Sequence, residues 1–268
     1  MRLAIEHWTS FSYESPIAEA QTELRLRPLD GSGQHCSAFR LVTDPPGVRI
    51  RSYLDHLGNQ IQHFDLLEPH DRLTVTAMSE VQTPAAFVDD RRTASQLELY
   101  DYRAPTEYVT LSPEVRDFAA LHAGTGSAAE RATSLSGAIF SDFTYETGVT
   151  DVHTRVDEVL ALRRGVCQDF AHLLLASCRC EGIAARYVSG YLFDPTAVGD
   201  AAASHAWVDV LDDTRGWVSL DPTHDREQTE AYVRVAVGRD YGDVPPTRGV
   251  YRGPAEETLA VRVALAPL

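Results

Sequence analysis

Residues 164–182 read RGVCQDFAHLLLASCRCEG, and this stretch decides the fold class. Apolar residues recur at helical spacing between Cys167 and Cys180, and Gly182 is placed to end the helix. The regularly spaced residues are Phe170, Ala171, Leu174, Leu175 and Cys178. Strand-like segments follow at 185–193, 206–211 and 217–220, and a turn-like sequence separates the last two. Helices followed by antiparallel strands predict an α+β domain.

Three helix starts precede this stretch. Ser112-Pro113 offers an N-cap residue followed by a proline in the first turn. Ser127 and Glu130 form a capping-box pattern ahead of an apolar run, and Thr154 opens a further helix. The helical part of the chain therefore begins shortly after residue 105.

The first hundred residues have a period of two instead. Polar and apolar residues alternate there, and clusters of Gly, Pro and Asp separate the alternating runs. The clearest runs are 21–27, 48–53, 60–66 and 73–81. This pattern predicts an antiparallel, sandwich-like β domain with one face toward water.

Two domains fit a chain of 268 residues. We predict the β domain over residues 1–105 and the α+β domain over residues 106–268. Within the second domain, residues 238–254 are rich in Gly, Pro, Tyr and Arg and are expected to form an ordered loop. Residues 259–265 are expected to form one more strand.

The charge of the chain excludes some partners. It carries 24 Lys and Arg against 39 Asp and Glu, a net charge of −15. Basic residues provide most nucleic-acid affinity, so we expect no nucleic-acid partner. We expect no membrane partner either, because the excess of acid disfavours anionic lipid surfaces and no stretch reaches the ~18–20 apolar residues of a transmembrane helix. The N-terminal residues lack the signal-peptide pattern, so a cytoplasmic location is expected.

Four cysteines are too few for a disulfide framework. They are Cys36, Cys167, Cys178 and Cys180. Cys167 stands out because it begins a predicted helix, where unpaired N–H groups and the helix dipole favour a thiolate. The same N–H groups could stabilise an oxyanion. The alternative is a buried, unreactive thiol, which is common for free cysteine.

A histidine and an aspartate are placed to serve that thiol. His205 begins a predicted strand, and Asp221 ends the next one along the chain. The turn between these strands makes them antiparallel neighbours, so the two side chains are expected at the same end of the pair. A carboxylate beside an imidazole fixes its tautomer and stabilises its protonated form. Each residue also has an ordinary interpretation: a solvent-facing histidine, and an aspartate in a turn before proline.

The chain resembles the transglutaminase-like superfamily of cysteine enzymes. The motifs that carry the resemblance are Gly165-Val-Cys-Gln-Asp-Phe-Ala-His172, Gly182-Ile-Ala-Ala-Arg-Tyr-Val-Ser-Gly-Tyr191, Ser204-His-Ala-Trp207 and Trp217-Val-Ser-Leu-Asp-Pro-Thr223. Weaker motifs are similar to the bacterial branch with an N-terminal β domain. These are Leu24-Arg-Leu-Arg-Pro28, Asp55-His-Leu-Gly-Asn59 and, near the C-terminus, Gly238-Arg-Asp-Tyr-Gly-Asp-Val-Pro-Pro246. Together they cover nearly the whole chain.

The resemblance implies a papain-like transglutaminase core with a catalytic triad of Cys167, His205 and Asp221. It also implies a thioester acyl-enzyme and a peptide or other amide as substrate, with no cofactor. We expect a peptidase or amidase. A protein-glutamine acyltransferase with an amine acceptor is the first alternative, and a non-catalytic peptide-binding protein is the second.

Other residues were weighed for the site. Gln168 and Tyr145 are candidates for the oxyanion site or the cleft, although an aromatic core role also suits Tyr145. Asp169 is interpreted as a helix-start carboxylate, and His172 as a packed residue or one on the substrate side. His224 could rival His205, and Tyr241 and Asp243 could edge the cleft. No metal site is predicted, because the spacing of Cys178 and Cys180 lacks a zinc pattern and the acidic residues lack that of a calcium loop.

Overall fold

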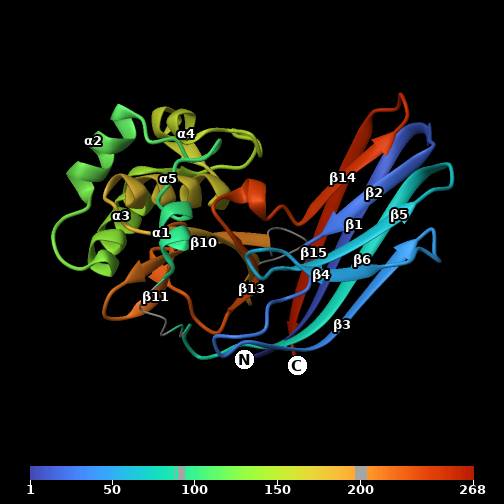
Figure 1. The fold of residues 1–268 in the computed structure, drawn as a ribbon, viewed down its shortest axis with the longest axis horizontal. Coiled ribbons are helices and arrows are strands. Elements are labelled where there is room, and N and C mark those ends of the chain that lie inside the picture. The colour runs from blue at the N-terminus through green and yellow to red at the C-terminus, as the bar shows by residue number, and fades with distance from the viewer. Residues whose placement is uncertain (88, 90–93, 197–203) are drawn as a thin grey trace.

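The computed structural model describes residues 1–87, 89, 94–196 and 204–268. Figure 1 shows a β sandwich beside an α+β core, with the two termini close together at one end of the sandwich. The predicted α+β fold class is confirmed. In the described part of the chain, no helix has the length and hydrophobicity needed to span a bilayer.

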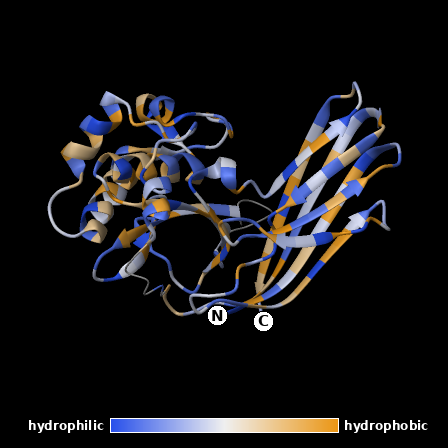
Figure 2. Cartoon of the chain, in the orientation of Figure 1, coloured by the Kyte–Doolittle hydropathy of each residue, from blue (hydrophilic) through white to orange (hydrophobic). Residues whose placement is uncertain are grey.

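The sandwich contains two antiparallel four-stranded sheets. The longer sheet has the order β15 (Glu257–Pro267), β1 (Arg2–Ile17), β6 (His70–Gln82) and β3 (His35–Asp44). The shorter sheet has the order β14 (Thr247–Arg252), β2 (Glu19–Leu24), β5 (Gln60–Leu66) and β4 (Arg51–Leu54). Phe11, Phe64 and Val75 are among the apolar residues buried between them. The alternation of apolar and polar residues along these strands is visible in Figure 2.

Two strands of the longer sheet, β1 and β3, were not among the predicted runs. In β1 the inward face carries His7 and Thr9, which are buried, while Trp8 lies on the opposite face. These residues blur the alternation of apolar and polar positions. The long pairing of β1 with both β6 and β15 forms the strand despite this weak local pattern.

The C-terminal segment corrects two expectations. Residues 238–254 are not only a loop: they include the 3-10 turn η1 (Tyr241–Asp243) and strand β14. Strands β14 and β15 pair with β2 and β1, so the last strands complete the sandwich, although the expected boundary at residue 105 assigned them to the core. Sequence periodicity identifies a strand but not its partner.

The core sheet is antiparallel and five-stranded. Its order is β12 (Arg226–Glu227), β11 (Gly216–Asp221), β10 (Ser204–Asp212), β9 (Ala185–Leu192) and β13 (Tyr232–Gly238). Its helices are α1 (Gln96–Asp101), α2 (Pro113–His122), α3 (Ala128–Asp142), α4 (Val156–Leu162) and α5 (Cys167–Cys180). Helix α5 packs on β9 and β10. Ser112 and Ser127 cap α2 and α3, as predicted, and β10 and β11 form the predicted hairpin.

The sandwich and the core share a hydrophobic cluster. Leu3, Ile5 and Val81 of the longer sheet pack with Tyr191 and Val233 of the core sheet. One face of the longer sheet therefore has two partners: it packs on the shorter sheet at one end and on the core at the other end. This shared burial holds the two parts together.

Two side-chain amides close the free edge of β13. Asn59 donates to the carbonyl of Val237 at 2.8 Å and accepts from its N–H at 2.7 Å. Gln34 makes the same pair of bonds with the main chain of Arg234, each at 2.8 Å. Asp55 holds Asn59 in place, and Gly58 at φ +84° allows the tight turn between them. Each amide thus satisfies backbone groups as an additional strand would.

Asn59→Ala is expected to lower the free energy of unfolding by about 2–4 kcal/mol, because it leaves both backbone groups of Val237 buried without partners. Urea denaturation measures this. Gln96→Ala, which removes an exposed amide from α1, is the control and should change stability by less than about 0.5 kcal/mol. Equal effects of the two substitutions would contradict the edge-closing role of Asn59.

Candidate active site

Cys167 is the first residue of α5, so its thiol lies at the N-terminal end of that helix. The N–H groups in the first turn of a helix have no intrahelical partners and point toward any group placed there. Asp169 accepts from the N–H of Val166 at 2.7 Å and from the hydroxyl of Thr150 at 2.7 Å. Asp169 is therefore the helix-start carboxylate that was predicted, and it anchors the turn that presents Cys167.

His205 lies between Cys167 and Asp221. Its Nε2 is 2.8 Å from Oδ2 of Asp221, and its ring lies near enough to the Cys167 side chain to interact with it. Burial alone would lower the pKa of His205, but the interactions with Asp221 and Cys167 outweigh it and raise the pKa to about 10. The ring is thus held where an imidazolium is stabilised.

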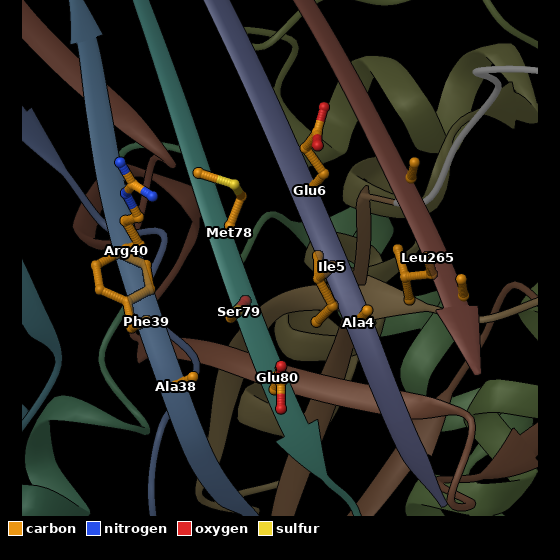
Figure 3. A pocket seen from close by; sticks show the side chains of 12 residues that line it. Ala4, Ile5, Glu6, Ala38, Phe39, Arg40, Met78, Ser79, Glu80 and Leu265 are labelled. Atoms are coloured by element: carbon orange, nitrogen blue, oxygen red, sulfur yellow. The ribbon is translucent and has the colours of Figure 1, made fainter. Parts of the chain in front are cut away.

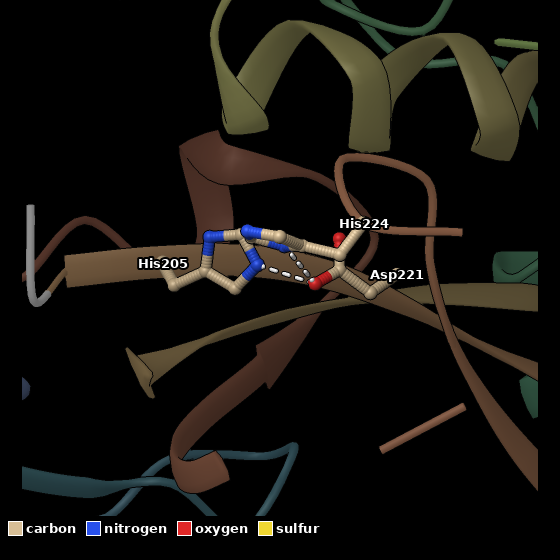
Figure 4. Close-up of side chains that lie close together, drawn as sticks. All are labelled: His205, Asp221 and His224. Carbon is tan, nitrogen blue, oxygen red and sulfur yellow. Dashed lines mark hydrogen bonds and ion pairs between the residues drawn. The ribbon is translucent and has the colours of Figure 1, made fainter. Parts of the chain in front are cut away.

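Asp221 is a buried carboxylate surrounded by donors. Its Oδ2 accepts from Tyr232 Oη at 2.6 Å and lies 2.8 Å from Nδ1 of His224. Its Oδ1 accepts from the N–H of Thr223 at 2.8 Å. Burial alone would raise the pKa of Asp221, but these bonds and the one to His205 hold it far below its ordinary value. Asp221 is therefore a charged acceptor for both histidines, which are drawn in Figure 4.

The same three side chains are the candidate metal ligands among the described residues. The ligand atoms of His205, Asp221 and His224 lie within 4.8 Å of one another. However, each histidine nitrogen is 2.8 Å from the same oxygen, which is a hydrogen-bond distance. Around a tetrahedral zinc ion, two ligand atoms that each lie 2.0–2.1 Å from the metal would be about 3.3 Å from one another. The arrangement is therefore that of a hydrogen-bonded cluster.

Trp207 stacks on the His205 ring, with centroids 5.9 Å apart and planes 26° apart. Trp207 is itself fully buried and meets Tyr232 edge-on. Gly190 on the neighbouring strand β9 is needed for this packing. A Cβ at that position would lie 2.6 Å from the Trp207 ring and 2.1 Å from the carbonyl oxygen of Val233.

Of the two oxyanion candidates, Tyr145 lies beside the Cys167 end of α5. Strand β7 (Thr144–Tyr145) pairs in parallel with β8 (Arg164–Gly165), which ends two residues before Cys167. Burial and the nearby Cys167 both raise the pKa of Tyr145. The Gln168 side chain instead donates to the carbonyl of Val152 at 3.2 Å. Its amide anchors the loop before α4, which leaves only its main-chain N–H for the oxyanion site.

His172 is packed inside the core. Its ring stacks on Tyr108, and its Nε2 accepts from the N–H of Tyr241 at 3.1 Å. Burial, with a smaller contribution from Arg179, lowers the pKa of His172 to about 3, so it is neutral. Tyr241 therefore touches helix α5 through its backbone.

The remaining candidates have ordinary structural surroundings. Asp243 forms an ion pair with Arg239. Cys178 is fully buried, and burial raises its pKa to about 12. Cys180 is partly buried at the end of α5.

Sequence reasoning missed Tyr232 and Trp207 as supports of the site. Tyr232 begins β13, a strand that was not predicted. Although β9 and β10 separate β13 from β11, the Tyr232 ring packs edge-on against Trp207 of β10, and its hydroxyl reaches Asp221. The apolar run 232–237 was the available signal for a strand, but no local pattern gives its position in the sheet. Trp207 is two residues after His205 in the same strand, but the ring contact depends on Gly190 across the strand pair.

Comparison with protein families matches both parts of the chain. Residues 117–222 match the model of the transglutaminase-like superfamily, and residues 3–82 match the bacterial transglutaminase-like N-terminal region. The uncharacterized protein ML0607 of Mycobacterium leprae is 36% identical over 279 residues, covering 100% of this chain and 99% of that protein. The chain belongs to the transglutaminase-like superfamily. The three residues Cys167, His205 and Asp221 all fall inside the matched transglutaminase-like core.

Other relatives extend the comparison over the full length. The uncharacterized protein Rv2569c of Mycobacterium tuberculosis is 34% identical, covering 99% of this chain and 93% of that protein. A crystal structure of a candidate cysteine protease from Cytophaga hutchinsonii aligns with a TM-score of 0.81. The alignment covers 100% of this chain and 91% of that one at 22% sequence identity. This likeness shows that the sandwich and transglutaminase-like core occur together in another solved protein.

A separate apolar hollow lies on the sandwich, on the face of the longer sheet turned away from the shorter one. Its lining includes Ala4, Glu6, Ala38, Arg40, Met78 and Ala264 (Figure 3). These side chains come from all four strands of that sheet, and none belongs to the candidate active site. The small alanines leave the space, and charged side chains border it.

Proposed function

We propose that this protein is a cysteine enzyme that cleaves amide bonds through a thioester acyl-enzyme. The observation that carries the proposal is the alignment of a helix-start thiol, an imidazole and a buried carboxylate. His205 bridges Cys167 and Asp221, with 2.8 Å between its Nε2 and the carboxylate. A nucleophile, a base and a group that orients the base are the parts that covalent acyl transfer requires.

Acylation begins with the Cys167 sulfur attacking the carbonyl carbon of the amide. A C–S bond forms, and the carbonyl oxygen becomes an oxyanion that the N–H groups at the start of α5 stabilise. The C–N bond then breaks as the His205 imidazolium gives its proton to the leaving amine. Tyr145 is proposed as a second donor to the oxyanion or as a wall of the cleft, because it lies beside the Cys167 end of α5.

Deacylation reverses these roles. His205 takes a proton from the incoming nucleophile, which attacks the thioester carbonyl and releases the thiolate. Water gives the free acid, so the enzyme is a peptidase or amidase. A primary amine gives a new amide, so the enzyme is a transglutaminase. Hydrolysis is the leading proposal because the structural neighbour is described as a candidate cysteine protease.

A mass-spectrometric assay separates these outcomes. The purified protein is incubated with a mixture of glutamine-containing peptides and a tagged primary amine, with Cys167→Ala as the control. Hydrolysis predicts free acids or shortened peptides that depend on Cys167. Tagged amides would favour the transferase. Recovery of unmodified peptides, with no acyl adduct on Cys167, would overturn the enzymatic proposal in favour of a peptide-binding protein.

A further inference from the structure

Two imidazole rings share one carboxylate oxygen at the candidate active site. Nε2 of His205 and Nδ1 of His224 each lie 2.8 Å from Oδ2 of Asp221 (Figure 4). An ionised carboxylate can only accept hydrogen bonds, so both nitrogens must donate. His205 therefore carries a proton on Nε2, which leaves Nδ1 as its free ring nitrogen. His224 carries its proton on Nδ1.

His224 is not placed to be a second base. Its Nδ1 is engaged by Asp221, and the imidazole that interacts with Cys167 is that of His205. The two histidines also differ in exposure: the His224 side chain is 41% exposed, but those of His205 and Asp221 are 6% and 1% exposed. His224 thus lies on the solvent side of a buried carboxylate, with its ring 5.2 Å from that of His205.

We propose that His224 is a positioning residue that holds Asp221 on His205 and shields the carboxylate from water. This inference rests on the proposed function of Cys167 and His205. The fold supplies a reason for the position: His224 is three residues after Asp221, beyond the turn in which Thr223 N–H also binds the carboxylate. Because water screens charges strongly, exclusion of water strengthens the attraction between Asp221 and the His205 imidazolium.

Other charged and titratable groups surround this cluster. Cys167 faces His205 from α5, and Tyr232 faces Asp221 from β13. Arg226 of β12 donates to the Tyr232 oxygen at 2.8 Å. Asp225 follows His224 in the chain, but its carboxylate lies over Gly137 of α3. Tyr232 would still hold Asp221 if His224 were removed, so a His224 variant keeps a partly ordered carboxylate.

Removal of His224 should weaken the attraction between Asp221 and the His205 imidazolium. In His224→Ala, water would reach Asp221 and reduce its attraction to His205, so the pKa of His205 would fall from its raised value. That imidazolium is the counter-charge for the attacking sulfur, so its weaker support should make Cys167 less reactive near neutral pH. In His224→Asn, the side-chain N–H₂ can replace the Nδ1–H donor without a titratable ring.

The test is the rate at which iodoacetamide alkylates Cys167 as a function of pH, followed by intact mass. Wild type, His224→Ala and His224→Asn are compared, and His35→Ala serves as a control at a histidine on the sandwich surface. We expect His224→Ala to react on the order of tenfold more slowly at pH 7 and to need a higher pH for half-maximal rate. His224→Asn and His35→Ala should stay within about twofold of wild type.

Several outcomes would overturn the inference. If the pH profile of His224→Ala superimposes on that of wild type while its thermal midpoint falls, His224 is structural only. If Cys167 is alkylated as slowly in His224→Asn as in His224→Ala, the Nδ1 hydrogen bond does not account for the effect of His224. If wild-type Cys167 shows no preferential alkylation over the other three cysteines, the proposed function fails, and the positioning role falls with it. Failure of the positioning role and failure of the proposed function can be told apart, because wild-type Cys167 is still alkylated preferentially in the first case and not in the second.

Discussion

Cys167→Ala is expected to abolish amide cleavage, with a rate loss on the order of 10³–10⁶. In the proposed mechanism the Cys167 sulfur is the atom that forms the acyl-enzyme, and the other three cysteines are not placed to replace it. Cys36 and Cys178 are buried, and Cys180 lies at the opposite end of α5. The loss is measured on the peptides that the wild type converts. In the wild type, alkylation should fall on Cys167 first.

The matched control for this prediction is Cys180→Ala, which removes a thiol from the far end of the same helix. It should keep nearly full activity. Cys167→Ala should also keep the thermal midpoint of the wild type, because alanine suits a helix and the side chain lost is small and only partly buried. Residual activity above about one tenth in a folded Cys167→Ala protein would contradict the proposed nucleophile.

Asp209→Ala is expected to lower the free energy of unfolding by about 3–5 kcal/mol. Asp209 is fully buried in β10 and accepts from Arg186 Nε at 2.8 Å and from both terminal nitrogens of Arg234. Ser219 also donates to it at 2.7 Å. Removal of the carboxylate would leave the buried guanidinium of Arg234 without its counter-charge, and would leave Arg186 with Asp89 alone, at 3.6 Å. Urea denaturation at pH 7 measures the effect.

The pH of that measurement matters. Burial alone would raise the pKa of Asp209, but Arg234 and Arg186 hold it below its ordinary value. A carboxyl whose folded-state pKa is depressed stabilises the protein fully above its unfolded pKa of about 3.9 and loses that contribution as the pH falls toward the folded-state value. The difference between wild type and Asp209→Ala should therefore be complete at pH 7 and shrink below about pH 4.

Asp213→Ala is the control, because Asp213 is exposed in the turn of the same hairpin. It should change stability by less than about 0.5 kcal/mol. A loss below about 1 kcal/mol for Asp209→Ala would mean that Arg186 and Arg234 find other partners. Such a result would remove the charge network as a main source of stability for the core sheet.

Local sequence patterns gave much of the fold. Features that depend on short-range backbone chemistry lie where they were predicted. They are the helix caps at Ser112 and Ser127, the helix from Cys167 to Cys180 and the hairpin around residues 212–216. The strands that were missed, including β1 and β3, lack a clean alternation. Their formation depends on partners that lie far away in the chain.

The candidate site also contains some residues that local sequence patterns identify and others that they do not. The helix start at Cys167 and the strand ends at His205 and Asp221 are local features, so the sequence alone could bring these three residues forward. Tyr232 could not be found, since its side chain reaches Asp221 across the sheet from β13 to β11, and no local pattern gives the order of those strands. The sequence suggests His224 only as a rival base, and the proposal of a positioning role depends on its 2.8 Å contact with the same Asp221 oxygen that His205 contacts.

By itself, the sequence determined the fold class, the helix that presents Cys167 and the superfamily motifs, because periodicity and capping are encoded within a few neighbouring residues. Only the tertiary structure decided that the last twenty residues complete the N-terminal sandwich, that Asn59 and Gln34 close the edge of β13, and that two histidines meet on Asp221. These features join residues as far apart in the chain as Leu3 and Pro267. Such contacts depend on strand order and shared burial, which no local pattern specifies.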